Sequence, residues 1–156
     1  MLDLVISGGQ RGSDLAGIVA AQRVNIPTGG TAPKFFKTEA GFQPVLRDRF
    51  NLKESHSNNY AVRTEQNIID SNVTIILAVN PCSPGTKLTI NLCKKHKKKY
   101  FIANPFIDPH ENLRGFLLFY RPKIVNVAGN RESIANGITR TGADYLTLCL
   151  QSIKNK

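Results

Sequence analysis

Four apolar runs in this chain end in short loops that contain glycine. The loops are Ser7-Gly8-Gly9-Gln10-Arg11-Gly12, Gly29-Gly30-Thr31, Ser83-Pro84-Gly85-Thr86 and Ala128-Gly129-Asn130-Arg131. A buried strand that runs into such a loop before a helix is the repeating unit of a parallel α/β sheet, which binds ligands at its carboxyl edge. Loops that expose backbone N–H groups at a helix start can cradle phosphate. The arrangement therefore predicts a pocket for a phosphorylated small molecule.

The rest of the hydrophobic pattern alternates between strands and helices. Short apolar runs predict buried strands at residues 2–6, 73–79, 100–103 and 124–128. Apolar residues at helical spacing predict helices at 13–26, 59–70, 86–96 and 111–119, and a last helical segment that opens at 130–138 and ends at 143–153. Because strands and helices alternate, we expect a single α/β domain over residues 1–156, Rossmann-like and doubly wound, with a mainly parallel sheet.

Two stretches carry a more local expectation. Ser13 and Asp14 are expected to provide the N-cap and a first-turn acid for the first helix. Residues 31–57 show little periodicity and are predicted to form a long connection, with a short strand near Phe50–Leu52. A connection of this length in a small domain is usually functional.

The charge of the chain favours anionic partners. Its formal net charge is +10, and many of the cations fall in the run Lys94–Lys99, at the predicted end of a helix. A solvated helix end is the preferred interpretation of this run, and a nucleic-acid surface is the less favoured alternative, because aromatic residues are not interleaved with it. Membrane association is not expected, since no apolar run is long enough to span a bilayer.

The three cysteines indicate a reducing compartment, so we expect a cytoplasmic protein. Cys82, Cys93 and Cys149 are odd in number and have no paired spacing. Cys93 and Cys149 are expected to fill the core, as buried free cysteines usually do. Cys82 lies in a loop assigned to the pocket edge, where a reactive role is the minor alternative.

The first glycine loop differs from two familiar phosphate-binding motifs. Its glycines do not follow G-x-G-x-x-G, and no lysine follows Gly12 as in a P-loop, which argues against a conventional NAD enzyme and against a P-loop NTPase. What remains is a flexible loop before a helix, from which Gln10 and Arg11 can reach a ligand. The alternative is a tight turn that needs glycine only for its backbone conformation.

Side chains near the other loops could also bind an anion. Arg63 could pair a phosphate through its planar fork, and Glu65 could bond a ring or ribose; the alternative is an exposed helix pair. Pro84, Gly85 and Thr86 head a helix with backbone amides and a hydroxyl, and Asn130 and Arg131 follow the last strand. No metal-ligand spacing, nucleophile elbow or Ser/His/Asp arrangement is present, so no catalytic residue and no metal site are predicted.

Several longer motifs occur in a fixed order along the chain. They are Ile6-Ser7-Gly8-Gly9-Gln10-x-Gly12-x-Asp14, Ile26-Pro27-Thr28-Gly29-Gly30-x-x-Pro33-Lys34, Tyr60-x-x-Arg63-Thr64-Glu65-x-Asn67, Asp70-Ser71-x-x-Thr74-Ile75-Ile76, Gly85-Thr86-x-Leu88-Thr89 and Val125-Asn126-Val127-Ala128-Gly129-x-Arg131-x-Ser133. Together these motifs resemble the putative molybdenum carrier family, which belongs to the SLOG group of Rossmann-like folds with the lonely-guy phosphoribohydrolases and the DprA proteins.

The resemblance implies a homo-oligomer, a dimer or tetramer, with a cleft for a phosphorylated ligand. In the carriers the implied ligand is a pterin, the molybdenum cofactor (molybdopterin). Elsewhere in the group it is a nucleotide or an ADP-ribose derivative. Matching positions imply ligand contact at Gly8, Gly9, Gln10, Gly12, Asp14, Gly30, Lys34, Arg63, Glu65, Gly85, Thr86 and Arg131.

Departures from the related motifs shape the functional hypothesis. Thr89 stands at the position where the related phosphoribohydrolases have a catalytic glutamate. The resemblance therefore argues against N-glycosidic hydrolysis. Pro84 and Arg11 also depart from the carrier pattern, so the ligand can differ from that of the carriers. We therefore expect a non-catalytic protein that carries or sequesters a phosphorylated small molecule. The alternatives are a sensor or sponge for a signalling nucleotide or ADP-ribose derivative, a nucleoside monophosphate phosphoribohydrolase, and a nucleic-acid module.

Overall fold

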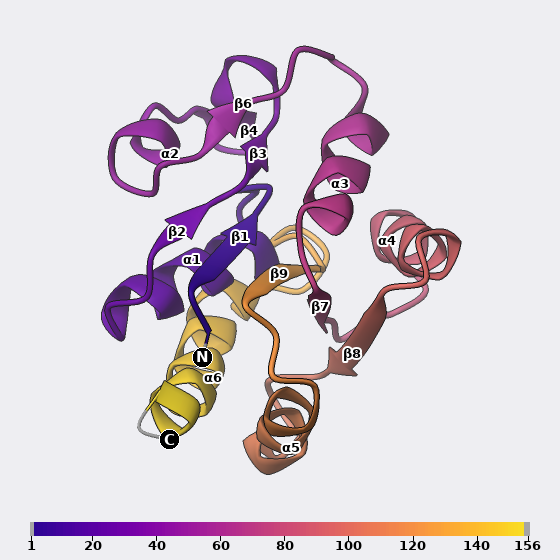
Figure 1. The fold of residues 1–156 in the computed structure, drawn as a ribbon. Coiled ribbons are helices and arrows are strands. Elements are labelled where there is room, and N and C mark those ends of the chain that lie inside the picture. Colours follow the sequence, from indigo (N-terminus) through magenta and orange to yellow (C-terminus); the bar gives the residue numbers. More distant parts are fainter. Residues whose placement is uncertain (1, 155–156) are drawn as a thin grey trace.

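A parallel sheet of five strands forms the centre of the protein (Figure 1). The computed structural model describes residues 2–154. In spatial order the strands are β2 (Thr28–Gly29), β1 (Leu4–Ser7), β9 (Ile124–Gly129), β7 (Val73–Leu77) and β8 (Lys99–Ala103), and every neighbouring pair is parallel. The predicted parallel α/β architecture is thus confirmed.

Helices cover both faces of this sheet, as a doubly wound fold requires. On one side α1 (Ser13–Arg23), α5 (His110–Tyr120) and α6 (Ile138–Lys154) pack together (Figure 1). On the other side α3 (Tyr60–Ile69) packs beside α4 (Pro84–Lys95). None of the helices formed by residues 2–154 is long and apolar enough to cross a membrane.

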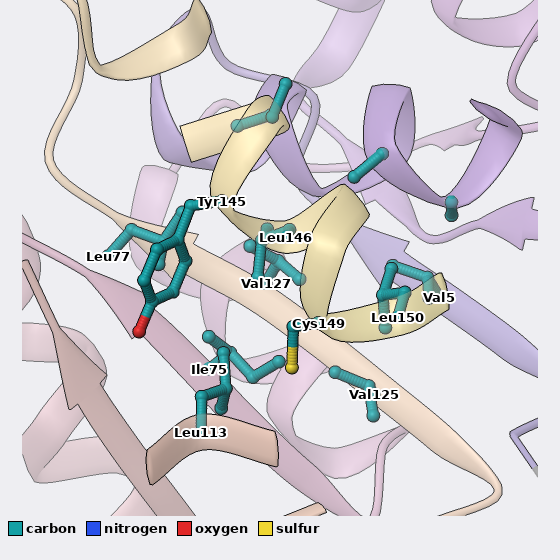
Figure 2. Packing of buried hydrophobic residues seen from close by; sticks show 14 of the residues in the cluster. Val5, Ile75, Leu77, Leu113, Val125, Val127, Tyr145, Leu146, Cys149 and Leu150 are labelled. Carbon is teal, nitrogen blue, oxygen red and sulfur yellow. The ribbon is translucent and has the colours of Figure 1, made fainter. Parts of the chain in front are cut away.

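The main core lies between the sheet and the α1, α5 and α6 layer. All five residues of β7 are buried, as expected for the central run of β-branched side chains. Figure 2 shows the Cys149 thiol of α6 close to Ile75, Leu113 and Val125, which come from two strands and a second helix. Cys93 is also fully buried, whereas Cys82 is exposed, in line with the expected division of the cysteines.

The segment after Gly30 is more ordered than the sequence predicted. It contains β3 (Thr31–Ala32), a 3-10 turn η1 (Lys34–Phe36), β4 (Lys37–Thr38), β5 (Gly41–Phe42), α2 (Val45–Asp48) and β6 (Lys53–Glu54). The strand expected near Phe50–Leu52 begins instead at Lys53, where it pairs with β3. Phe36, Leu46, Phe50 and Leu52 form a second small core with Ile18 of α1. These apolar residues are irregularly spaced, so neither helical nor strand periodicity revealed them.

The starts of two helices also differ from the prediction. Gly12, and not Ser13, is the N-cap of α1, and no side chain caps it. The last helix begins at Ile138, because residues 130–137 form a turn. The Glu132 carboxylate in this turn accepts hydrogen bonds from the Gly137 and Thr139 amides and from the Thr139 hydroxyl, and it thereby holds the start of α6.

Candidate functional site

The loops that follow β1, β7 and β9 meet at the carboxyl edge of the sheet. Gly12 and Arg131 form an isolated antiparallel bridge between the first and last loops. The Ser13 hydroxyl donates to the carbonyls of Leu77, at 2.8 Å, and Asn130, at 2.9 Å. Ser13 therefore connects the start of α1 to the carboxyl ends of β7 and β9. This explains why its hydroxyl does not cap its own helix.

Asn130 is a structural centre of this edge. Its side-chain oxygen accepts from the amides of Val79 and Asn80, at 2.8 and 2.9 Å. Its side-chain nitrogen donates to the Asn80 carbonyl and to the hydroxyls of Ser83 and Thr86. Since Asn130 is 1 % exposed and its amide is fully engaged, it shapes the loop before α4 and has no free group for a ligand.

Close approach of backbones accounts for two of the predicted glycines. A Cβ added at Gly30, whose φ is +120°, would lie 2.3 Å from the carbonyl oxygen of Ser7. A Cβ at Gly129, whose φ is +137°, would lie 1.9 Å from the carbonyl oxygen of Leu77. At these two positions the neighbouring backbone itself requires glycine, because no side chain would fit.

A pocket of about 380 Å³ lies at the N-terminus of α4. Pro84 has no N–H, and the amides of Gly85 and Thr86 lie in the first turn, where a helix leaves its N–H groups without internal acceptors. Arg131 adds a cation to the same wall. Four residues that the sequence analysis did not select complete the lining with Gly129: Tyr60, Ser83, Leu88 and Ile134.

The first glycine loop uses its amides within the protein. The Gly9 amide donates to the Ser7 hydroxyl at 3.1 Å, and the Gln10 amide donates to the Asp14 carboxylate at 3.2 Å. Gly8 lies directly beneath the Arg63 guanidinium, and Gly9 faces side chains of the second core. Two of the amides of this loop are therefore already used within the protein.

Arg63 and Asp14 form a buried ion pair beside this loop. The distance from Arg63 Nη1 to Asp14 Oδ2 is 3.2 Å, and the side chains are 4 % and 10 % exposed. Burial raises the pKa of Asp14, although the charge of Arg63 and the Gln10 amide partly oppose the rise. The pair brings two predicted site residues together from α1 and α3.

Tyr60 connects this ion pair with the pocket. Its ring centroid is 4.3 Å from Cζ of Arg63 and 4.8 Å from Cζ of Arg131. A Cβ added at Gly85 would lie 3.5 Å from the Tyr60 hydroxyl, so this ring also approaches the first turn of α4. A signal for Tyr60 was present in the sequence, because it precedes Arg63 by three residues and so shares its helix face.

Of the fifteen predicted site residues, Pro84, Gly85, Thr86 and Arg131 line the pocket and eleven do not; Glu65, Lys34 and Arg11 are among those outside it. The Glu65 carboxylate is bound by Lys95 at 2.9 Å and by His96 at 2.7 Å, and hydrogen bonds from these residues lower its pKa. Lys34 stacks its ammonium over the Phe35 ring at 5.2 Å, and Arg11 is exposed. Glu65 therefore pairs with residues at the end of α4 and not with Arg63, the partner that the alternative of an exposed helix pair required.

A larger cavity, of about 570 Å³, lies at the opposite edge of the sheet. Its walls are mostly apolar and come from the amino end of β1, the turn before β2 and the ends of α5 and α6. They include Leu2 and Lys154, the first and last described residues. The smaller pocket is the better candidate site, because it combines a helix N-terminus with an arginine at the edge where parallel sheets bind ligands.

The fold and the site define a Rossmann-like domain with a cationic pocket at the carboxyl edge of a parallel sheet. The family model of the circularly permutated YpsA SLOG family matches residues 5–150, and the chain belongs to this family. It is also similar to the crystal structure of a protein from Syntrophus aciditrophicus SB named "putative molybdenum carrier protein", with a TM-score of 0.86 and 28 % identity over 96 % of this chain and 95 % of that one. A comparison with curated proteins gave no match.

Proposed function

We propose that this protein binds a phosphorylated small molecule at the N-terminus of α4 and holds it without turnover, as a carrier or sequestering protein. The observation that carries the proposal is the convergence of the first turn of α4 and Arg131 on one pocket. A phosphate there would accept charge-assisted hydrogen bonds from the guanidinium and from the amides of Gly85 and Thr86. The name of the structural neighbour makes the molybdenum cofactor the first candidate ligand.

The residues of the pocket fit the phosphate of such a cofactor. Among residues 2–154, no group of three His, Cys, Asp or Glu side chains is placed to hold a metal ion. In this proposal the protein grips the organic part of the ligand through its phosphate, and the ligand supplies any metal ligands itself. Nucleotide and ADP-ribose derivatives carry the same phosphate group and are the next candidates.

Two features of the site weigh against hydrolysis of an N-glycosidic bond. Thr89 is 3 % exposed, and its hydroxyl donates to the Gly85 carbonyl of its own helix at 3.1 Å. Glu65, the other candidate acid, has a lowered pKa and is bound by Lys95 and His96. A threonine hydroxyl has no acidic proton to give near neutral pH, and a general acid needs a pKa near the working pH, so neither Thr89 nor Glu65 suits that role.

Calorimetric titration with inorganic phosphate, nucleoside monophosphates and isolated molybdopterin tests the binding proposal. Arg131→Ala should weaken binding of each phosphorylated ligand about tenfold to a hundredfold, since a hydrogen bond from a charged donor is lost. Arg140→Ala is the matched control, because it removes the same charge from an exposed position on α6. Equal effects of the two substitutions would show that the pocket is assigned wrongly.

A second measurement separates carrier from enzyme. The protein is incubated with nucleoside monophosphates, and free base is measured by chromatography. We expect no release above the rate of the buffer alone. Release that scales with protein concentration would replace the carrier proposal with the phosphoribohydrolase alternative.

A further inference from the structure

The Arg63 guanidinium is buried with only one of its nitrogens bonded. Nη1 donates to Asp14, whereas Nε and Nη2 have no hydrogen-bond partner among the described residues. These two nitrogens form one side edge of the planar group and present two parallel N–H bonds. An edge of this kind is suited to two acceptor atoms that lie side by side in one plane.

A second unpartnered polar atom belongs to a residue bonded to the same carboxylate. The backbone N–H of Gln10 and Nη1 of Arg63 both donate to Oδ2 of Asp14. The side-chain oxygen of Gln10 is buried and has no donor among residues 2–154. The region around Asp14 therefore offers two free donors and one free acceptor.

The charge balance decides which kind of group this region can take. Asp14 already neutralises Arg63, and both side chains are nearly excluded from water. A second phosphate beside Asp14 would bring an anion into a buried site with no remaining countercharge, which is unfavourable. Neutral acceptor atoms carry no such penalty, and Arg131 remains available for the phosphate of the same ligand.

Tyr60 contacts both arginines of the proposed site. The Cζ atoms of Arg63 and Arg131 both lie within 5 Å of the Tyr60 ring centroid. The two guanidinium groups are therefore close to each other. Tyr60 lines the pocket, and its ring also packs against the Arg63 guanidinium. It is the first residue of α3 and only half-buried, so its side chain can turn aside without unwinding the helix.

We propose that Arg63 and Gln10 form a second subsite that recognises the ring of the phosphorylated ligand by a keto oxygen next to an unprotonated ring nitrogen, with Tyr60 as its movable cover. A 6-oxopurine carries this edge at O6 and N7, and its N1–H is placed next to O6 for an acceptor such as Gln10. An oxidised pterin carries a similar keto and ring-nitrogen pair. Adenine presents an amino donor in place of the keto oxygen and is disfavoured. The inference rests on the proposed phosphate site.

The test compares nucleotides that share a phosphate and differ only in the ring edge. Calorimetric titration of the parent protein should give affinities for GMP and IMP about tenfold to a hundredfold higher than for AMP, the range for one bidentate contact. GMP with N7 replaced by a carbon (7-deaza-GMP) should bind at least about fivefold more weakly than GMP, since one of the two acceptors is lost. Oxidised 6-hydroxymethylpterin phosphate, run alongside, distinguishes a pterin from a purine source of this edge.

Arg63→Lys supplies the protein side of the test. Lysine keeps the charge that balances Asp14 but lacks the planar fork, so the ratio of GMP affinity to AMP affinity should fall to within about threefold. Equal affinities for AMP and GMP in the parent, or a preference that survives in Arg63→Lys, would overturn the subsite. The comparison of GMP with 7-deaza-GMP uses only the parent and stands even if the variant does not fold.

The two proposals fail in different ways. If every nucleotide binds equally and Arg131→Ala weakens them all, the phosphate site stands and the ring subsite is wrong. If none of the nucleotides or the pterin phosphate binds, the phosphate site is wrong and the ring subsite falls with it.

Discussion

Replacing Gly129 by alanine should destabilise the protein strongly, because two backbones touch at this position. The new Cβ would lie 1.9 Å from the carbonyl oxygen of Leu77, against an ordinary contact distance of 3.4–4 Å. The φ of +137° also disfavours any side chain. To relieve the contact, β9 must move from β7 where the Asn130 amide donates to the Leu77 carbonyl at 2.9 Å. Backbone strain of 1–3 kcal/mol and one weakened hydrogen bond give a loss of about 2–4 kcal/mol.

Urea unfolding followed by circular dichroism measures this loss, and the melting temperature should fall by roughly 5–15 °C for a chain of this size. Gly115→Ala is the matched control, because Gly115 lies within α5 and a Cβ there would meet nothing within 4 Å. The control should gain about 0.5–1 kcal/mol from better helix propensity. A Gly129→Ala variant within 0.5 kcal/mol of the parent would refute the claim that close strand approach requires this glycine.

Three further predictions follow from burial. In the native protein a thiol reagent such as DTNB should label Cys82 alone, since burial raises the pKa of Cys93 and raises that of Cys149 to about 12; labelling of all three without denaturant would contradict this. Leu46→Ala should cost about 2–4 kcal/mol in urea unfolding, because Leu46 is 2 % exposed in the second core, and a loss near zero would show that this core contributes little. Burial raises the folded-state pKa of Asp14 above 3.8, so its contribution to stability is complete below about pH 3.8 and is lost as the pH rises through the folded pKa. Unfolding free energies measured across this range should fall for the parent relative to Asp14→Asn, and a relative rise would refute the shift.

The sequence predicted four of the five strands of the central sheet, because each of these four is a short apolar run with a clear end. It did not predict β2, since Thr28–Gly29 is too short and too polar to give such a signal. The helices α3, α4 and α5 lie within about two residues of their predicted bounds, since their apolar residues recur at helical spacing. The structure of residues 31–54 was not predicted, because their apolar residues follow no helical or strand spacing. They form a core only through contact with Ile18 of α1. Residues 130–137 escaped prediction because Glu132 and the bridge between Gly12 and Arg131 hold them as a turn.

The candidate site divides in a similar way. Pro84, Gly85, Thr86 and Arg131 were predicted from their place after strands, and the structure brings them to one pocket. The roles of other predicted residues depend on neighbours that are distant in the sequence. The side-chain amide of Asn130 is fully hydrogen-bonded to the loop before α4 and to Thr86. The carboxylate of Glu65 is paired with Lys95 at the end of α4. Single-sequence spacing does not reveal such partners.

By itself, therefore, the sequence determined four strands of the central sheet, the loops that follow them and the edge at which these loops meet, because apolar periodicity and parallel topology are properties of the chain pattern. Only the tertiary structure decided which polar groups at that edge remain available. It placed Asp14 against one side of Arg63, the Tyr60 ring 4.3 Å from Cζ of Arg63, and the amides of Gly9 and Gln10 against side-chain oxygens. The physical reason is that hydrogen bonds and burial are settled between residues far apart in the chain, and they determine whether a donor is already satisfied or is free to bind a ligand.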